Sequence, residues 1–152
     1  MSSPSENLKA LGLNLPEVAA PVAAYVPAVT DRGVVRTSGQ LPFANGELLA
    51  TGAVGEGGTD PHLATQAAKA CALNCLAAAA AAAGGLDNLS GCVKVTGFVS
   101  SKVDFTGQPA VINGASELFG AVFGDAHARS AVGVAVLPLD ASVEVEAEFS
   151  LA

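Results

Sequence analysis

The most reactive side chains in this sequence are three cysteines and two histidines. Cys71 and Cys75 are four residues apart, about one helical turn, a spacing that two metal ligands on one helix could use. A zinc site would need a third and a fourth ligand, whereas His62 and His127 fall in separate loops of the predicted structure. We therefore expect reduced thiols packed in the interior, with neither a metal nor a cofactor.

Arg129 and a row of glutamates are the charged side chains that could act on a small molecule. Glu144, Glu146 and Glu148 alternate along one predicted strand, so they share a face. This pattern is also that of an ordinary polar face, and position alone does not say which glutamate faces a cleft. Arg129 taken alone is more often part of a structural ion pair. His127 can exchange a proton near neutral pH, although a lone histidine in a loop is more often solvated.

The composition narrows the classes of function. The chain has 152 residues, of which 51% are hydrophobic and 14% are charged, and its net charge is −7. This size predicts one domain, and so little charge suggests surface hidden in an oligomer. The negative charge opposes nucleic-acid binding. The longest uncharged stretch, residues 70–86, is shorter than the ~20 apolar residues of a membrane span. Glu6 and Glu17 do not suit a secretory signal, so we expect a cytoplasmic protein.

The elements that must position these side chains follow from turns, caps and periodicity. Residues 1–20 are expected to form an N-terminal arm, and residues 21–152 a single domain. A hairpin is predicted over residues 24–40 around Asp31-Arg32-Gly33, and then a Gly-rich loop over 41–58 with a short edge strand at Leu48-Leu49. Helices are predicted over 61–83 and 108–123, and further strands over 92–100, 130–137 and 142–151.

This order of elements suggests one mixed sheet with two helices on one face, an α+β arrangement. The other face must either be polar or be buried against another subunit. The low charge favours burial in an oligomer.

Several sequence motifs occur in an order that resembles a known family. They are Tyr25-Val26, Thr37-Ser38-Gly39-Gln40-Leu41-Pro42, residues 93–99, Asp104-Phe105, Asn113, Arg129-Ser130-Ala131-Val132, Leu137-Pro138 and residues 143–147. Together they resemble the Rid family of reactive intermediate deaminases, also called YjgF-type or L-PSP proteins, over residues 21–150. The resemblance implies a chorismate-mutase-like fold. It also implies a homotrimer whose sheets form a central barrel, with three clefts between subunits.

The resemblance also implies an activity. Members hydrolyse imine tautomers of 2-aminoacrylate and related enamines to 2-oxo acids and ammonium, so we expect a hydrolase similar to a 2-iminobutanoate/2-iminopropanoate deaminase. In that family, the residue matching Arg129 binds the substrate carboxylate and the residue matching Glu144 positions or activates the attacking water. By the same carry-over, the residues expected to contact the substrate are Tyr25, Ser38, Gly39, Asn113 and the backbone N–H of Ala131.

The sequence departs from this pattern in two places. Many active members have Cys and Glu where this chain has Ala131 and Gly133. The chain is also longer, with the N-terminal arm and the loop from Gly52 to Gly58. Two other functions stay open. A non-catalytic module that binds a 2-oxo acid would use Arg129 without Glu144. An endoribonuclease would need a cationic track and aromatic stacking surfaces, which seven basic residues and one Tyr do not provide.

Overall fold

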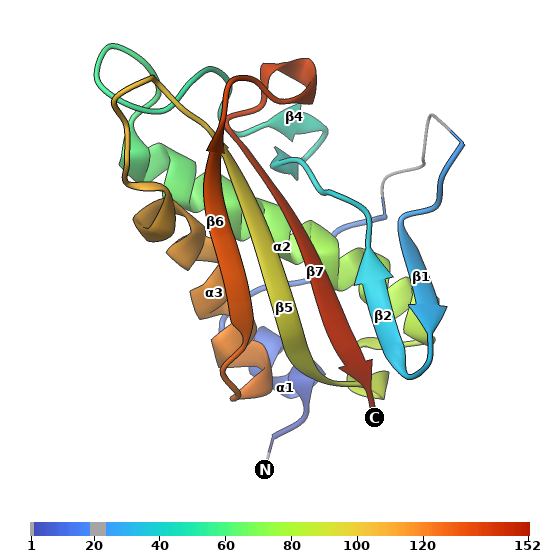
Figure 1. Ribbon diagram of the computed structural model, residues 1–152. Coiled ribbons are helices and arrows are strands. Elements are labelled where there is room, and N and C mark those ends of the chain that lie inside the picture. Colours follow the sequence, from blue (N-terminus) through green and yellow to red (C-terminus); the bar gives the residue numbers. More distant parts are fainter. Residues whose placement is uncertain (1, 19–23) are drawn as a thin grey trace.

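A computed structural model describes residues 2–18 and 24–152 as a five-stranded mixed sheet with helices on one face (Figure 1). The strands lie in the order β1-β2-β7-β5-β6. Neighbouring strands run antiparallel, except for β5 and β6, which are parallel. The strand bounds are β1 (Ala28–Asp31), β2 (Val34–Thr37), β5 (Leu89–Ser100), β6 (Ala128–Val134) and β7 (Val143–Leu151). The predicted α+β sheet with two helices on one face is confirmed.

Two tight hairpins precede the long helix. The β1–β2 hairpin turns at Arg32 and Gly33, both at positive φ (52° and 79°), as a two-residue turn matched to strand twist requires. A second hairpin, β3 (Phe43–Ala44) and β4 (Glu47–Leu48), turns at Asn45-Gly46 in the same way. The sequence analysis predicted the first hairpin. Only an edge strand at Leu48-Leu49 was predicted for the second hairpin, although Asn45-Gly46 is a typical hairpin turn.

The long helix α2 (Pro61–Ala83) has the predicted bounds. The Asp60 side chain accepts a hydrogen bond from the His62 backbone N–H, Pro61 occupies the first turn, and Gly84 ends the helix at φ 82°. His62 therefore lies in the first turn of α2, as the predicted helix bounds require, and the separate expectation of a loop at His62 was wrong. None of the helices in the described part of the chain is both long enough and apolar enough to cross a membrane.

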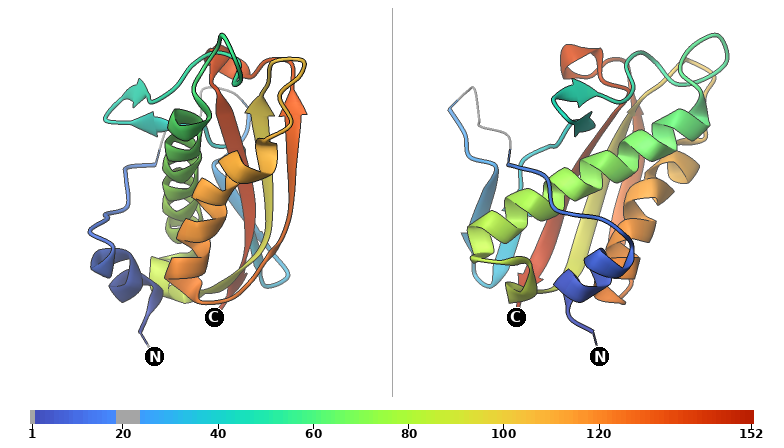
Figure 2. Two further views of the ribbon diagram at one scale, coloured as in Figure 1. Left: turned by 90° about the vertical axis from the view of Figure 1, so that its left-hand side faces the viewer. Right: turned by 180° about the vertical axis from the view of Figure 1, so that it is seen from behind.

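Helix α3 (Gln108–Phe123) also has the predicted bounds, and it ends at Gly124. It packs closely on α2, because a Cβ at Gly114 would collide with the backbone carbonyl of Thr65. Figure 2 shows both helices lying across the same face of the sheet. The buried side chains of α3 recur at helical spacing and include Ile112, Ala115, Leu118, Phe119 and Val122.

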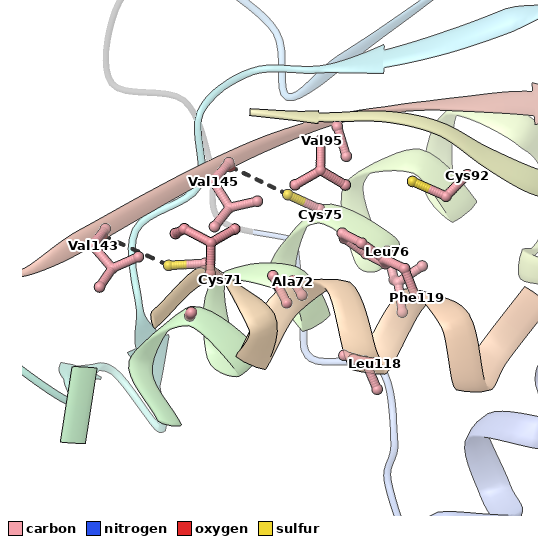
Figure 3. Close-up of a cluster of buried hydrophobic side chains, with 14 of the residues drawn as sticks. Cys71, Ala72, Cys75, Leu76, Cys92, Val95, Leu118, Phe119, Val143 and Val145 are labelled. Atoms are coloured by element: carbon pink, nitrogen blue, oxygen red, sulfur yellow. Dashed lines mark hydrogen bonds between the residues drawn. The ribbon is translucent and has the colours of Figure 1, made fainter. Parts of the chain in front are cut away.

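The three cysteines are buried in this core, as predicted (Figure 3). Cys71 Sγ donates to the Val143 carbonyl at 3.7 Å and Cys75 Sγ to the Val145 carbonyl at 3.3 Å. Burial raises the pKa of the Cys71 thiol well above its usual value, and raises those of Cys75 and Cys92 to about 12. These thiols are therefore packing groups.

The N-terminal arm forms a short helix, α1 (Pro4–Ala10), that packs against α3 and the 3₁₀ turn at Leu86–Asn88. Leu8 is buried in the core, and Ser5 binds the Asp87 carboxylate through both its backbone N–H (2.8 Å) and its hydroxyl (2.6 Å). In the described range 2–18, the arm thus braces the helix layer (Figure 2).

Three strands begin or end at residues other than those predicted. Strand β5 begins at Leu89 instead of residue 92, because its first residues pair with the end of β7. Strand β6 spans Ala128–Val134 instead of 130–137. Its limits are set by parallel pairing with β5, from Lys94 opposite Ala128 to Ser100 opposite Val134. The 3₁₀ turn Pro138–Asp140 then leads into β7, which begins one residue later than predicted.

No described helix or strand covers the sheet face turned away from the helices (Figure 1), which is called the uncovered face below. It carries Arg36, Lys94, Thr96 and the three glutamates of β7, and Arg36 forms ion pairs with Glu148 (2.9 Å) and Asp31 (3.9 Å). Toward the other end of the strands the face becomes apolar, with Phe98 opposite Val132, which is 43% exposed. The face is therefore polar in part, and its burial in a trimer stays a prediction.

Candidate active site

Arg129 is held on the helix side of the edge strand β6 by three neutral oxygen atoms. Its Nη1 donates to Asn113 Oδ1 at 2.8 Å and to Ser116 Oγ at 3.2 Å, and its Nη2 donates to the Pro109 carbonyl at 3.2 Å. All three acceptors belong to α3. The structure therefore brings Arg129 together with Asn113.

The charge of Arg129 has no partner in the described part of the chain. Every salt bridge among residues 2–18 and 24–152 belongs to Arg36. Of the five N–H groups of the guanidinium, the three bonds to α3 leave Nε–H and one Nη2–H without an acceptor among the described residues. Two such groups on one planar cation suit a carboxylate. The structural ion pair considered in the sequence analysis is absent from the described residues.

Glu144 lies on the opposite face of the sheet from Arg129. Its neighbours along β7, Val143 and Val145, are fully buried toward the helices, so Glu144 points to the uncovered face. A Cβ at Gly39 would collide with the Glu144 carboxylate, and the bridge between Gln40 and Val145 fixes this placement. The glycine therefore permits the close approach of the carboxylate to the backbone of residue 39.

Ser38 precedes Gly39 directly, and hydrogen bonds connect Ser38 to the segment that follows Tyr25. The Ser38 hydroxyl donates to the Val26 carbonyl at 2.6 Å, and the Ser38 backbone N–H donates to the Pro27 carbonyl at 2.8 Å. These bonds tie the segment after Tyr25 to the end of β2. The Tyr25 side chain is 51% exposed.

The structure distinguishes the three glutamates that the sequence left equivalent. Glu148 is neutralised by Arg36 and lies opposite Lys94, and Glu146 lies opposite Thr96. Glu144 lies opposite Phe98. Burial, and secondarily the charge of Glu146, raise the pKa of the Glu144 carboxyl above its ordinary value.

His127 lies just before β6 and is partly buried, so the expectation of a solvated histidine was wrong. Its Nε2 is 2.9 Å from Ser116 Oγ, and its ring meets the Phe119 ring edge to face at a centroid distance of 6.3 Å. Ser116 thus contacts both His127 and Arg129, and the sequence analysis missed it. Because Asn113 and Ser116 are three residues apart on α3, helical spacing could have indicated that they share a face.

The two positions that depart from the family pattern lie along β6. Ala131 is partly buried against the core. It follows Arg129 by two residues, so both side chains lie on the same side of β6. A Cβ at Gly133 would meet Gln108 Nε2 at 2.7 Å and Ser101 Oγ at 3.1 Å. Gln108, which donates to the Phe105 carbonyl at 2.8 Å, thus fills the space beside Gly133 that a larger side chain would need.

Within one chain the predicted site residues form two groups. Arg129 and Asn113 lie on the helix side of β6, while Glu144 and Gly39 meet on the uncovered side. Ser38 is next to Gly39, and its hydroxyl binds the carbonyl of the residue that follows Tyr25. The intervening sheet separates Arg129 from Glu144. One copy of the chain therefore cannot bring both side chains to one small molecule.

Solved structures share this fold, and a sequence relative matches most of the chain. The protein Atu1372 from Agrobacterium tumefaciens is 41% identical and superposes with a TM-score of 0.89, over 98% of this chain and 92% of that one. E. coli TdcF, solved with bound serine, is 26% identical with a TM-score of 0.66, over 90% of this chain and 94% of its own. Protein TCP17 from Trypanosoma cruzi is 44% identical over 144 residues, which are 93% of this chain and 89% of TCP17.

These likenesses define a mixed α+β fold of the YjgF type. The family model described as Endoribonuclease L-PSP matches residues 16–148. The chain therefore belongs to the Endoribonuclease L-PSP family, the YjgF/Rid proteins. The resemblance inferred from the motifs is confirmed.

Proposed function

We propose that this protein hydrolyses imines derived from amino acids, such as 2-iminopropionate, to 2-oxo acids and ammonium. The observation that carries the proposal is the unpaired guanidinium of Arg129, fixed by three neutral oxygens with two N–H groups left over. Such a group binds a planar carboxylate through charge-assisted hydrogen bonds. Serine, the ligand of the related TdcF structure, also carries a carboxylate beside a nitrogen-bearing carbon.

Glu144 is the proposed acid–base residue. Its raised pKa moves it toward working pH, where a general base is most effective. Its carboxylate would take a proton from water as the water oxygen bonds to C2 of the iminium, and the C=N electron pair would move to nitrogen. Glu144 would then return that proton to the nitrogen, and the C2–N bond would break as the carbonyl forms. The hydroxyl proton passes to the departing ammonia, and the products are a 2-oxo acid and ammonium.

A second copy of the chain would complete the site. Because Arg129 and Glu144 lie on opposite faces of one sheet, catalysis by both requires Arg129 from one copy and Glu144 from another. The free edge of β6, the exposed apolar side chain of Val132 and the uncovered sheet face support such an assembly. We propose the homotrimer of the YjgF type, with an obligate interface of order 2,000 Å² or more.

Binding without catalysis is the second candidate, and the Ala131 and Gly133 departures favour it. A module that binds a 2-oxo acid would use Arg129 and Asn113 and would leave Glu144 idle. Cleavage of RNA is less well supported, because the chain is acidic and the glutamates of β7 line its uncovered face. The support for it is the description of the family and the names of some related structures.

The test is turnover of an imine made in place. A serine dehydratase releases 2-aminoacrylate, and pyruvate is followed with and without the purified protein. The spontaneous reaction sets the baseline. A protein that binds 2-oxobutyrate but leaves the pyruvate rate at this baseline would refute the hydrolase and support the binding module.

A further inference from the structure

Ser116 joins an imidazole to the guanidinium of the candidate site. Its hydroxyl oxygen lies 3.2 Å from Arg129 Nη1 and 2.9 Å from His127 Nε2. Since Arg129 can only donate, Ser116 accepts that bond, and it remains free to donate its own proton to His127 or to accept one from it. His127 therefore touches the proposed carboxylate site through a single side chain.

The Nδ1 side of the His127 ring is buried in protein. The Phe119 ring packs edge to face against it at an interplanar angle of 85°, and Nδ1 is buried with no hydrogen-bond partner among the described residues. A charged imidazolium would carry an unpaired N–H there. Burial, followed by the nearby charge of Arg129, lowers the pKa of His127 below its ordinary value.

Arg129 is the charge that acts on this ring. On α3, Glu117 lines a groove with Leu11 and Lys69 and so faces away from β6. On β5, Lys94 points to the uncovered face of the sheet, and Asp125 is exposed in the loop before His127. A ligand that neutralises Arg129 would therefore remove the principal charge that opposes protonation of His127.

We propose that His127 is a positioning residue for the carboxylate site: it holds Arg129 through Ser116 and takes up a proton when a carboxylate binds there. This inference rests on the proposed function insofar as a carboxylate binds at Arg129. Anion and proton then bind cooperatively, and by reciprocity the protonated protein binds the carboxylate more tightly. We expect the affinity for a 2-oxo acid to rise roughly five- to tenfold between pH 7.5 and pH 5.5, at the lower end of usual site-to-site coupling.

Calorimetry tests the proton uptake directly. Binding of 2-oxobutyrate is measured at pH 6 in two buffers of different ionisation enthalpy, so that the difference in heat reports the protons taken up. His127→Gln keeps a polar group near Ser116 but cannot titrate. The matched control is His62→Gln, which removes the only other histidine, an exposed residue on α2.

The wild type and His62→Gln should take up protons on binding, whereas His127→Gln should bind without uptake. Uptake that persists in His127→Gln, or none in the wild type, would overturn the role of His127 while leaving the carboxylate site intact. No binding by the wild type in either buffer would overturn the carboxylate site and this role together. NMR of the His127 ring in the unmutated protein gives a second readout, because its titration midpoint must rise when 2-oxobutyrate is added.

Discussion

Replacing Arg129 by alanine is the sharpest test of the carboxylate site. The structure leaves two guanidinium N–H groups for a ligand. A hydrogen bond to a charged group contributes about 1.5–3 kcal/mol, and about 1.4 kcal/mol corresponds to a tenfold change in affinity. Because Arg129 is only partly buried, solvent screening reduces the total, so we expect Arg129→Ala to weaken 2-oxobutyrate binding at least tenfold in calorimetry.

Lysine at the same position should restore little of this affinity. The guanidinium contacts Asn113, Ser116 and the Pro109 carbonyl while keeping two N–H groups on a planar fork. An ammonium group has three N–H donors on one atom. It therefore cannot make the same contacts to α3 and also bind a carboxylate through two parallel hydrogen bonds. Arg129→Lys should therefore resemble Arg129→Ala more than the wild type.

Two controls separate binding from folding. Arg36→Ala removes a strand arginine from the opposite face and should leave the affinity unchanged. Arg129→Ala should lower the free energy of unfolding by no more than about 1.5 kcal/mol, because water can replace its bonds to part-exposed acceptors. Equal affinity of the wild type and Arg129→Ala, with both proteins folded, would refute the carboxylate role.

Four further expectations concern Glu144, the glycine beside it and the assembly. Glu144→Gln should lose roughly 10²–10⁴-fold in imine turnover, while Glu148→Gln keeps the wild-type rate. Because burial raises the pKa of Glu144, its ionised form opposes folding above that pKa, so Glu144→Gln should unfold no more easily than the wild type at pH 7. Gly39→Ala, which forces the flexible end of the Glu144 side chain to shift, should lower imine turnover and change the free energy of unfolding by no more than about 0.5 kcal/mol. Gly120→Ala, in open space on α3, should raise the free energy of unfolding by about 0.4–1 kcal/mol. Light scattering at micromolar concentration should give a trimer, and a monomer would contradict the shared site.

The helices could be predicted from the sequence because their ends depend on local signals. Asp60 and Pro61 start α2, and Gly84 and Gly124 end α2 and α3, whatever the rest of the chain does. The ends of β6 could not be predicted in this way. They depend on how far β5 runs beside it, a contact between distant segments.

The same distinction holds for the candidate site. The family motifs indicated both Arg129 and Asn113, but nothing in the sequence showed that one binds the other across 16 positions. Glu144 differs from Glu146 and Glu148 only through the register of the strands, which sets it opposite Phe98 and against Gly39. Ser116 acquires its importance from two partners that only the packing of α3 on β6 brings to it.

The buried thiols bear on how this protein could handle a reactive substrate. The C=N carbon of an imine is an electrophile, and the thiolate is the nucleophilic form of cysteine. With pKa values raised to about 12 by burial, Cys75 and Cys92 are thiolate in only about one molecule in 10⁵ at pH 7. Cys71 is fully buried as well, and β6 carries an alanine at position 131. The folded chain thus presents almost no thiolate that could attack the imine. A protein of this kind could therefore turn over its substrate many times without modification of its own cysteines.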